Sequence, residues 1–381
     1  MAPKTNPEVF SPGEYIRDEL EARGWTQTDL AKILGWWPKD VNRLVTGKQA
    51  ITIETAKCLA EAFDTSAQLW MNLETSYQLA KRSASTDPGV IKRAKIYSKV
   101  PVSEMQKRHW IESTENADVL EAQVLSFFKL PSLDDPIILP YAARMPESGA
   151  ELNQFQVAWL RRARQIGPAA PTTGQFSAAS IERALKSLTP LMANFEDIRR
   201  VPEVLGRYGI RLVLLESLPH TKIDGACFWL DADSPVIVLS FRYDRIDWFW
   251  HTLAHELKHV LNRDGLEAAI IDMQLVGDDA QPYVEGKPER EREADLFAIH
   301  FLIDQKELDN FIARVHPLYS HMKILGFANR IGVHPGIVVG QLHFRRKISY
   351  AHSRKMLVKV RAALSSSALT DGWGDAIPIK H

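Results

Sequence analysis

The sequence predicts an α+β protein that is mainly helical and contains a small β-sheet, and three observations support this fold class. The chain has 381 residues, which is enough for two or three domains that each bury a core. Helical periodicity with short turns covers most of the chain. Between residues 209 and 241, by contrast, runs of β-branched and aromatic residues are bounded by Gly, Pro and Asp, which is typical of strands.

Composition limits the class of protein. Apolar residues make up 45% and charged residues 25%, as in ordinary globular proteins, and the formal net charge is zero. Bulk charge therefore favours neither nucleic acid nor a membrane as a partner. The two cysteines, Cys58 and Cys227, stand far apart, which excludes a disulfide framework and fits a reducing compartment. Because the sequence shows neither a signal-like start nor a long uncharged apolar stretch, we expect a cytoplasmic protein with no membrane partner.

Residues 1–82 predict a bundle of short helices with a helix-turn-helix at GWTQTDLAKILGWWPKDVNRLVTGKQAIT. Thr26 is the expected N-cap of the first helix of the motif, and Gly35 supplies its C-terminal turn. Pro38 fits the first turn of the second helix, where its missing N–H costs nothing. The apolar residues of this second helix that would face the core are Val41, Leu44 and Val45.

The start of the second helix of such a motif reads base edges in the major groove of DNA. Lys39 and Arg43 could meet guanine or phosphate there, and Asn42 also points outward. Gln27, at a helix N-terminus, and Lys48 are expected phosphate contacts. Residues 1–82 hold ten basic and eleven acidic side chains, so charge alone leaves open a small bundle that binds nothing.

The rest of the chain divides into three predicted segments. Residues 83–205 are predicted as a helical linker or middle domain, with Phe155 and Trp159 in its core. Residues 206–310 carry the three strand patterns, helices near 244–262 and 289–307, and a polar, Gly-rich loop between these helices. Residues 311–381 form a basic helical C-terminal region, with ten Lys or Arg and no acidic residue from 311 to 370. A solvated basic face is the expected role, with contact to DNA or to an acidic substrate as alternatives.

The helix pattern WHTLAHELKHVLN holds His255, Glu256 and His259 in the order His-Glu-x-x-His. Residues four apart share a helix face, so the two histidines can converge on one metal ion. Glu256 is placed to polarise a water molecule bound to that metal. Neutral imidazoles suit Zn²⁺, which predicts a zinc site, although an amphipathic helix that happens to carry two histidines is the alternative.

A catalytic zinc site has three protein ligands, so a third ligand is needed besides the two histidines. Asn262 and Gly265 stand where a metzincin would have its further Gly and His, so that arrangement is absent. Downstream, the helix pattern EREADLFAIHFLID offers Glu291 or Glu293 as a carboxylate ligand. Asp295 would then contact one of the metal ligands and orient it, without binding the metal itself.

The stretch DGACFWLDADSPVIVLSFRYDRIDWFWHTLAHELKHVLN, followed by EREADLFAIHFLID, resembles the ImmA/IrrE family of zinc metallopeptidases. The resemblance implies that His255 and His259 bind zinc, that Glu256 is the catalytic general base and that Glu293 is the third ligand. It also implies that PVIVLSF (235–241) is an edge strand, which would pair with an extended substrate. Asp295 departs mildly from the Asn more usual in the family. Peptide hydrolysis also needs a group that stabilises the oxyanion formed at the scissile carbonyl. Tyr283 and His334 are the candidates, but a structural role is expected for each.

Residues 11–81 are similar throughout to the Xre-type helix-turn-helix of HigA-like antitoxins, and ILGFANRIGVHPGIVVGQLHFRRK (324–347) resembles the tail of HigA-type regulators fused to ImmA/IrrE peptidases. This resemblance implies a homodimer that binds double-stranded DNA at a pseudo-palindromic operator. Trp36 and Trp37 depart from the pattern, and Trp37 at the N-cap site lacks a capping oxygen.

We therefore expect a DNA-binding transcriptional regulator with zinc-dependent endopeptidase activity. Its expected substrate is a partner regulator or its own linker, in a stress, mobile-element or toxin–antitoxin circuit. The alternative is a non-catalytic repressor or antitoxin whose zinc domain senses a signal or binds a partner.

Overall fold

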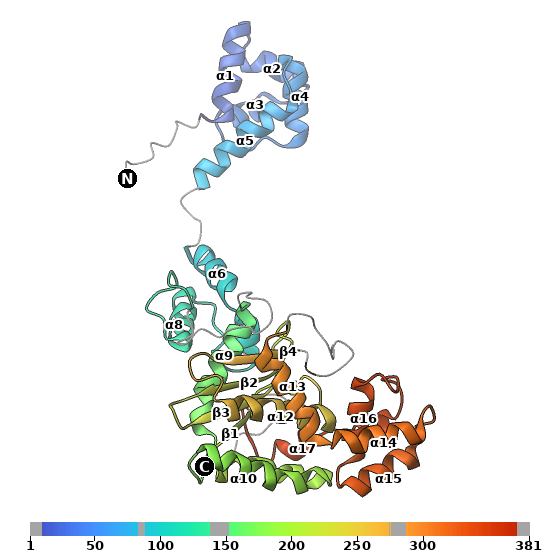
Figure 1. Cartoon of the computed structure of the whole chain (residues 1–381). Coiled ribbons are helices and arrows are strands. Elements are labelled where there is room, and N and C mark those ends of the chain that lie inside the picture. Colours follow the sequence, from blue (N-terminus) through green and yellow to red (C-terminus); the bar gives the residue numbers. More distant parts are fainter. Residues whose placement is uncertain (1–9, 83–87, 138–151, 274, 276–286, 372–381) are drawn as a thin grey trace. The chain divides into compact units, whose positions relative to one another are not determined.

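The computed structural model describes residues 10–82, 88–137, 152–273, 275 and 287–371 (Figure 1). Contacts divide the chain into two compact units, Met1–Ile91 and Lys92–His381. The helical segment after residue 91 thus belongs to the same unit as the sheet. The further divisions at residues 205 and 310 remain predictions.

The N-terminal unit is a small helical bundle. Its helices are α1 (Pro12–Arg23), α2 (Gln27–Leu34), α3 (Pro38–Val45), α4 (Ile53–Phe63) and α5 (Ala67–Arg82). The predicted cap of α2 is confirmed: the Thr26 side chain accepts a hydrogen bond from the Asp29 N–H, and Gly35 ends the helix in the left-handed conformation. Pro38 occupies the first turn of α3. The apolar core that holds these helices together includes Ile16, Leu30, Val41, Leu44, Leu59, Phe63 and Trp70.

A five-stranded sheet forms the centre of the second unit. Its order is β4 (Ile270–Met273), β2 (Ile223–Trp229), β3 (Pro235–Leu239), β1 (Arg211–Leu214) and β5 (Leu369–Thr370). β2 runs antiparallel to β3 and β4, whereas β1 runs parallel to β3 and β5. The mainly helical α+β fold class predicted from the sequence is confirmed.

Two expectations about strands are wrong. The stretch at 235–241 was expected to be an edge strand, but β3 pairs with β1 on one side and with β2 on the other. The segment between the two long helices was expected to be a loop, but it contains β4. Three of the four residues of β4 are buried, but the run is only four residues long and is interrupted by Asp272, so it gives a weak strand signal. The edges of the sheet are therefore β4 and β5.

The sheet is packed on both faces because its strands alternate side chains between two cores. Val236 and Val238 of β3 face one core, and Ile237 and Leu239 face the other. The first core receives α6 (Pro88–Lys99), α7 (Val102–Lys107), α8 (Ala117–Phe128) and α9 (Gln154–Ile166). The helices on the second side are α10 (Ala178–Leu188), α11 (Val201–Arg207), α12 (Ile246–Asn262), α13 (Glu289–Leu302), α14 (Gln305–Val315), α15 (His321–Ile331), α16 (Pro335–Phe344) and α17 (Arg361–Leu364).

The predicted core role of Trp159 is confirmed, because its side chain is fully buried. Its indole N–H is shared between the carbonyls of Leu215 and Glu216, at 3.0 and 3.1 Å. This contact fastens α9 to the segment that follows β1. It explains why the predicted linker helices and the sheet form one unit.

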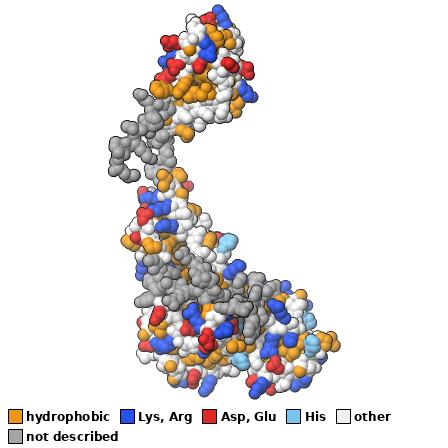
Figure 2. Space-filling model, turned by 45° about the horizontal axis from the view of Figure 1, so that its top comes forward, with side chains coloured by type: hydrophobic (Ala, Val, Ile, Leu, Met, Phe, Trp, Pro, Cys, Tyr) orange, Lys and Arg blue, Asp and Glu red, His pale blue; other side chains and the backbone are white. Residues whose placement is uncertain are grey.

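Among the described residues, no helix combines the length and apolarity needed to cross a lipid bilayer. On the face shown in Figure 2, basic and acidic side chains are interspersed on both units. Part of the basic C-terminal region is neutralised by α14, since Arg330 lies 2.6 Å from Glu307 and Arg345 lies 2.5 Å from Asp309.

Candidate metal centre

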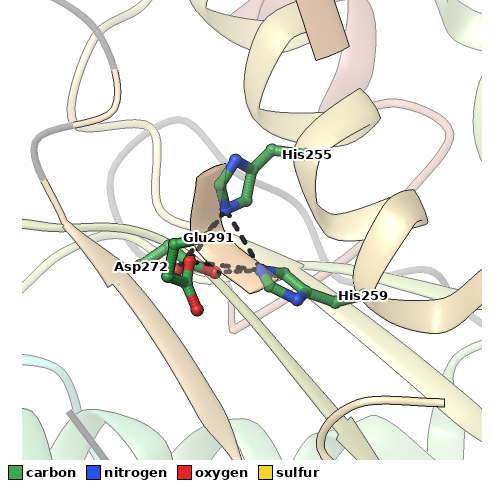
Figure 3. A group of neighbouring side chains, drawn as sticks. All are labelled: His255, His259, Asp272 and Glu291. Atoms are coloured by element: carbon green, nitrogen blue, oxygen red, sulfur yellow. Dashed lines mark hydrogen bonds and ion pairs between the residues drawn. The ribbon is translucent and has the colours of Figure 1, made fainter. Parts of the chain in front are cut away.

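Helix α12 carries the two histidines into the interior of the second unit. It packs against β2, β3 and α13, and almost all of its residues are buried. The side chains of His255 and His259 are both 0% exposed. Their four-residue spacing places them one helical turn apart on the same face, and their Nε2 atoms lie 3.1 Å apart (Figure 3). The helix therefore presents two imidazole nitrogens to a single point.

Two carboxylates from other elements reach the same point. Glu291 of α13 places Oε2 3.4 Å from the Nε2 atom of each histidine. Asp272 of β4 places Oδ1 3.5 Å from His255 Nε2 and Oδ2 3.6 Å from His259 Nε2. One ligand atom from each of the four side chains lies within 4.8 Å of the others, and all four side chains are buried.

These distances fit a tetrahedral metal ion. Four donors at the zinc–nitrogen and zinc–oxygen distances of about 2.0–2.1 Å would be about 3.3 Å apart. The two histidine nitrogens lie 3.1 Å apart, and each lies 3.4 Å from Glu291 and 3.5–3.6 Å from an oxygen of Asp272. Two imidazoles and two carboxylates also form a donor set that suits Zn²⁺.

The other nitrogen of each histidine faces a further acid. Asp295 Oδ1 lies 3.0 Å from His255 Nδ1, and Asp264 Oδ2 lies 3.0 Å from His259 Nδ1. An acceptor at Nδ1 favours the tautomer with the proton on Nδ1, which leaves the Nε2 lone pair free for a metal. Asp295 thus lies where the sequence analysis expected an orienting residue. Asp264 was not predicted.

The carboxylates make this buried region strongly attractive to a cation. Burial opposes protonation of His259, but Asp272, Asp264 and Glu291 outweigh it and raise the pKa of His259 to about 9. Burial would raise the pKa of Glu291, but hydrogen bonding and charge from the two histidines hold it far below its usual range. Both shifts have one cause, since opposite charges in close contact favour the charged form of each partner.

Glu256 lies beside this cluster and is fully buried. Among the described residues, no hydrogen-bond donor reaches either of its carboxylate oxygens. A Cβ atom at Gly225 of β2 would stand 2.1 Å from Glu256 Oε1, so the absence of a side chain at Gly225 makes room for the carboxylate. Burial, and then the negative charge of Asp272, raise the pKa of Glu256 well above its usual range.

The expected third ligand, Glu293, lies outside the cluster, and the acid that α13 brings to the two histidines is Glu291. Position 293 is about 200° around the helix from position 291. Glu291 shares the buried stripe of α13 with Ala294 and Ala298. The Glu293 side chain is 50% exposed and contacts Lys258 at 3.6 Å and Asn262 at 3.4 Å.

A hollow of about 630 Å³ adjoins the cluster. It is formed by the segment between α12 and β4 and by the start of α13. Asp264, which faces His259, lies on its wall, as does Arg290, the neighbour of Glu291. The volume is in the range of sites that take a small ligand or a few peptide residues.

Of the two candidates for stabilising an oxyanion, Tyr283 lies outside the described residues. His334 is the N-cap of α16, and its Nδ1 accepts a hydrogen bond from the Gly336 N–H at 3.0 Å. Its own N–H donates to the Met192 carbonyl at 2.7 Å. These contacts give His334 a capping role in the fold.

In the N-terminal unit, the five predicted DNA contacts lie on α2, on α3 and on the turn after α3. Lys39, Asn42, Arg43 and Lys48 are exposed, and Gln27 is partly exposed. The Asn42 side-chain amide donates to Gln27 Oε1 at 3.2 Å, so these two side chains bridge the helices of the motif. Nearby, the exposed N-cap residue of α3, Trp37, makes no capping hydrogen bond from its side chain.

Comparison with known proteins assigns both parts of the chain. A helix-turn-helix family model matches residues 16–70, and a model described as the IrrE N-terminal-like domain, a peptidase family, matches residues 206–342. The chain is 30% identical over 82 residues to the uncharacterized HTH-type transcriptional regulator YddM of Escherichia coli, covering 22% of this chain and 87% of that protein. It is 37% identical over 79 residues to virulence-associated protein I of Dichelobacter nodosus, covering 20% and 73%.

A solved structure, Pseudomonas aeruginosa antitoxin HigA with the higBA promoter, is 34% identical and covers 21% of this chain and 98% of that chain, with a TM-score of 0.20. The chain belongs to the helix-turn-helix transcriptional regulators, and it joins the helix-turn-helix to an IrrE-like domain of the metallopeptidase type.

Proposed function

We propose that the second unit is a zinc-dependent endopeptidase. The observation that carries this proposal is the convergence of His255, His259 and Glu291 on one point, with Glu256 buried beside them. When bound, zinc would acidify a water molecule and polarise the carbonyl of the scissile bond. The two histidines and Glu291 would hold the ion, while Asp264 and Asp295 keep the imidazoles in the metal-binding tautomer.

Glu256 is the proposed general base. Its carboxylate would accept a proton from the attacking water and then return it to the leaving amine. The space opposite Gly225 lets the carboxylate turn without meeting a side chain from β2.

An extended substrate would pair with an edge of the sheet. β4 is the edge strand that carries a residue of the cluster, and it pairs with β2 alone. The free side of β4 could therefore accept a peptide by strand addition. The proposed substrate is a partner regulator or a segment of this chain, in a stress, mobile-element or toxin–antitoxin circuit.

The test uses the purified full-length protein and a Glu256→Gln variant. We expect near-stoichiometric zinc in both, because Glu256 is not a ligand. Incubation with zinc, followed by mass spectrometry, should reveal self-cleavage products only in the wild type. In cells, sequencing of newly formed protein N-termini should identify a cleaved regulator that stays intact with the variant. Identical products from both proteins would contradict the peptidase proposal. So would the absence of any cleavage by a protein whose metal site is open to an added ligand.

We propose that the N-terminal unit binds an operator in cytoplasmic DNA as a homodimer. Support comes from the helix-turn-helix match and from the exposed polar residues of α3 and the following turn. If Arg43 contacts a base, Arg43→Ala should weaken specific binding by about 1–3 kcal/mol. Lys48→Ala should weaken binding to all sequences and reduce the salt dependence by about one ion. Lys57→Ala, which changes an exposed residue of α4, is the control. Light scattering during gel filtration would test whether the protein is a dimer.

The second candidate is a non-catalytic repressor or antitoxin in which the metal domain is a sensor or a partner-binding scaffold. The buried carboxylate of Asp272, which completes a four-residue cluster, favours this alternative. In that case, binding to a promoter fragment should persist in Glu256→Gln but change when zinc is removed. A toxin reading frame beside the gene would favour the antitoxin form.

A further inference from the structure

The edge strand β4 brings a carboxylate to the two histidines. Asp272 lies opposite Gly225 in the pairing with β2, next to an irregularity in the register between Ile223 and Gly225. Its side chain is only 3% exposed. Figure 3 shows it on the same side of the histidines as Glu291. Asp272 thus lies about as close to the two histidine nitrogens as Glu291 does, and it is a ligand candidate that comes from a strand and not from a helix.

The burial of Asp272 needs a physical reason. No donor among the described residues reaches its Oδ2 atom. A buried carboxylate oxygen without a hydrogen bond is costly, and Glu291 adds a second buried carboxylate to the same point. A divalent cation between these side chains would offset that cost. The separations of 3.5 and 3.6 Å from the histidine nitrogens suit such an ion.

We propose that Asp272 is a fourth protein ligand of the metal and that it closes the site, so that the second unit folds in a latent form. This inference rests on the zinc site proposed above and adds its regulation. Catalytic zinc sites keep three protein ligands and one open position, whereas sites with four protein ligands are typical of structural zinc. With Asp272 as a ligand, the four protein donors would leave no open position for a water molecule.

The fold lets this fourth ligand move separately from the others. His255 and His259 belong to α12 and Glu291 to α13, and these two helices pack on each other. Asp272 belongs to β4, an edge strand that pairs with β2 and packs through Ile271 and Met273 against the core on the side of α9, away from α12 and α13. A shift of β4 would withdraw Asp272 and leave the other three ligands in place. In the closed arrangement, the five side chains at the site, Glu256 included, are each 3% exposed or less.

The test uses the full-length protein loaded with Co²⁺, whose visible absorption reports its ligands. Acetohydroxamate, which binds metals through two oxygens, probes for an open position. We expect the wild-type spectrum to stay unchanged at acetohydroxamate concentrations that shift the spectra of Asp272→Asn and Asp272→Ala. Both variants should also lose zinc affinity, by about 100-fold or more for Asp272→Ala, because a ligand counts for more than the outer-layer residues whose loss costs about 10–100-fold. Glu267→Gln, an exposed acid in the segment before β4, is the control and should behave as the wild type.

Two results would overturn the inference: acetohydroxamate shifting wild type and variants at the same concentration, or zinc affinity that is unchanged in both variants. The wild-type measurement does not depend on how a variant folds, and Asp272→Asn preserves the shape of the side chain. Peptide cleavage is scored separately. Variants that admit acetohydroxamate but cut no protein would support the closed site and contradict the peptidase function. Variants that admit it and cut faster than the wild type would support both.

Discussion

Glu291 and Glu293 offer a matched pair of substitutions, because they stand two residues apart on α13 and differ in their surroundings. Glu291 is 1% exposed and lies 3.4 Å from both histidine nitrogens. The Glu293 side chain is 50% exposed, and its ion pair with Lys258 spans 3.6 Å. Changing each to Gln removes one charge from the same helix and keeps the shape of the side chain. The structure predicts that only Glu291→Gln weakens metal binding.

The size of the effect follows from the contacts. Loss of a residue in the outer layer of a metal site costs about 10–100-fold in affinity, so loss of a ligand should cost at least about 100-fold. When zinc is in excess, that loss removes about 2.7 kcal/mol of metal-linked stability. For a unit of this size, the melting temperature should fall by roughly 5–10 °C. Glu293→Gln loses an exposed ion pair worth about 0.5 kcal/mol, or roughly 1–2 °C.

Two measurements check this prediction. Competition with a chromophoric chelator gives the zinc affinity, and calorimetry with zinc or with EDTA gives the melting temperature. In EDTA, the zinc-linked part of the deficit of Glu291→Gln should disappear, because neither protein then holds zinc. The part that remains reports the contacts of Glu291 with Arg290 and the two histidines. Loss of zinc binding in Glu293→Gln, with normal binding in Glu291→Gln, would refute the assignment of the third ligand.

Three further predictions concern other parts of the second unit. Gly225→Ala should lower cleavage by about 100-fold with little loss of zinc, because the new Cβ atom displaces the carboxylate of Glu256. Burial, opposed by Arg242 and assisted by the charge of Asp272, raises the pKa of Asp224 to about 6. The folded state therefore holds this proton more tightly than the unfolded chain, so the contribution of Asp224 to the free energy of unfolding should fall between about pH 4 and pH 6. EDTA should lower the melting temperature of the second unit and leave that of the N-terminal unit unchanged.

Each of these three predictions can be tested directly. Gly326→Ala, where a Cβ atom meets nothing within 4 Å, is the control for Gly225→Ala in the cleavage and zinc assays. Urea unfolding of EDTA-treated protein from pH 4 to 7 measures the effect of Asp224, and Asp224→Asn should abolish that part of the pH dependence. An equal slope in the variant would contradict the stated role of Asp224. A single melting transition that shifts as a whole with EDTA would contradict independent units.

The fold was predictable where local signals decide the structure. Thr26, Gly35 and Pro38 act within one turn of the chain, and the structure has each in the expected role. The strand patterns at 209–216, 225–231 and 235–241 also correspond to β1, β2 and β3. Which strand lies at an edge was not predictable in this way, because pairing joins residues far apart in sequence. β4 has only four residues, one of them Asp272, and was too short to be recognised as a strand.

By itself, the sequence determined the helix-turn-helix and the convergence of His255 and His259, because a spacing of four residues fixes a shared face on any helix. Only the tertiary structure decided between Glu291 and Glu293, since the choice depends on which side of α13 packs against α12. The tertiary structure also brought Asp272 to the same point from an edge strand. A metal site draws its ligands from separate elements, and the position of one element against another is set by the packing of the core.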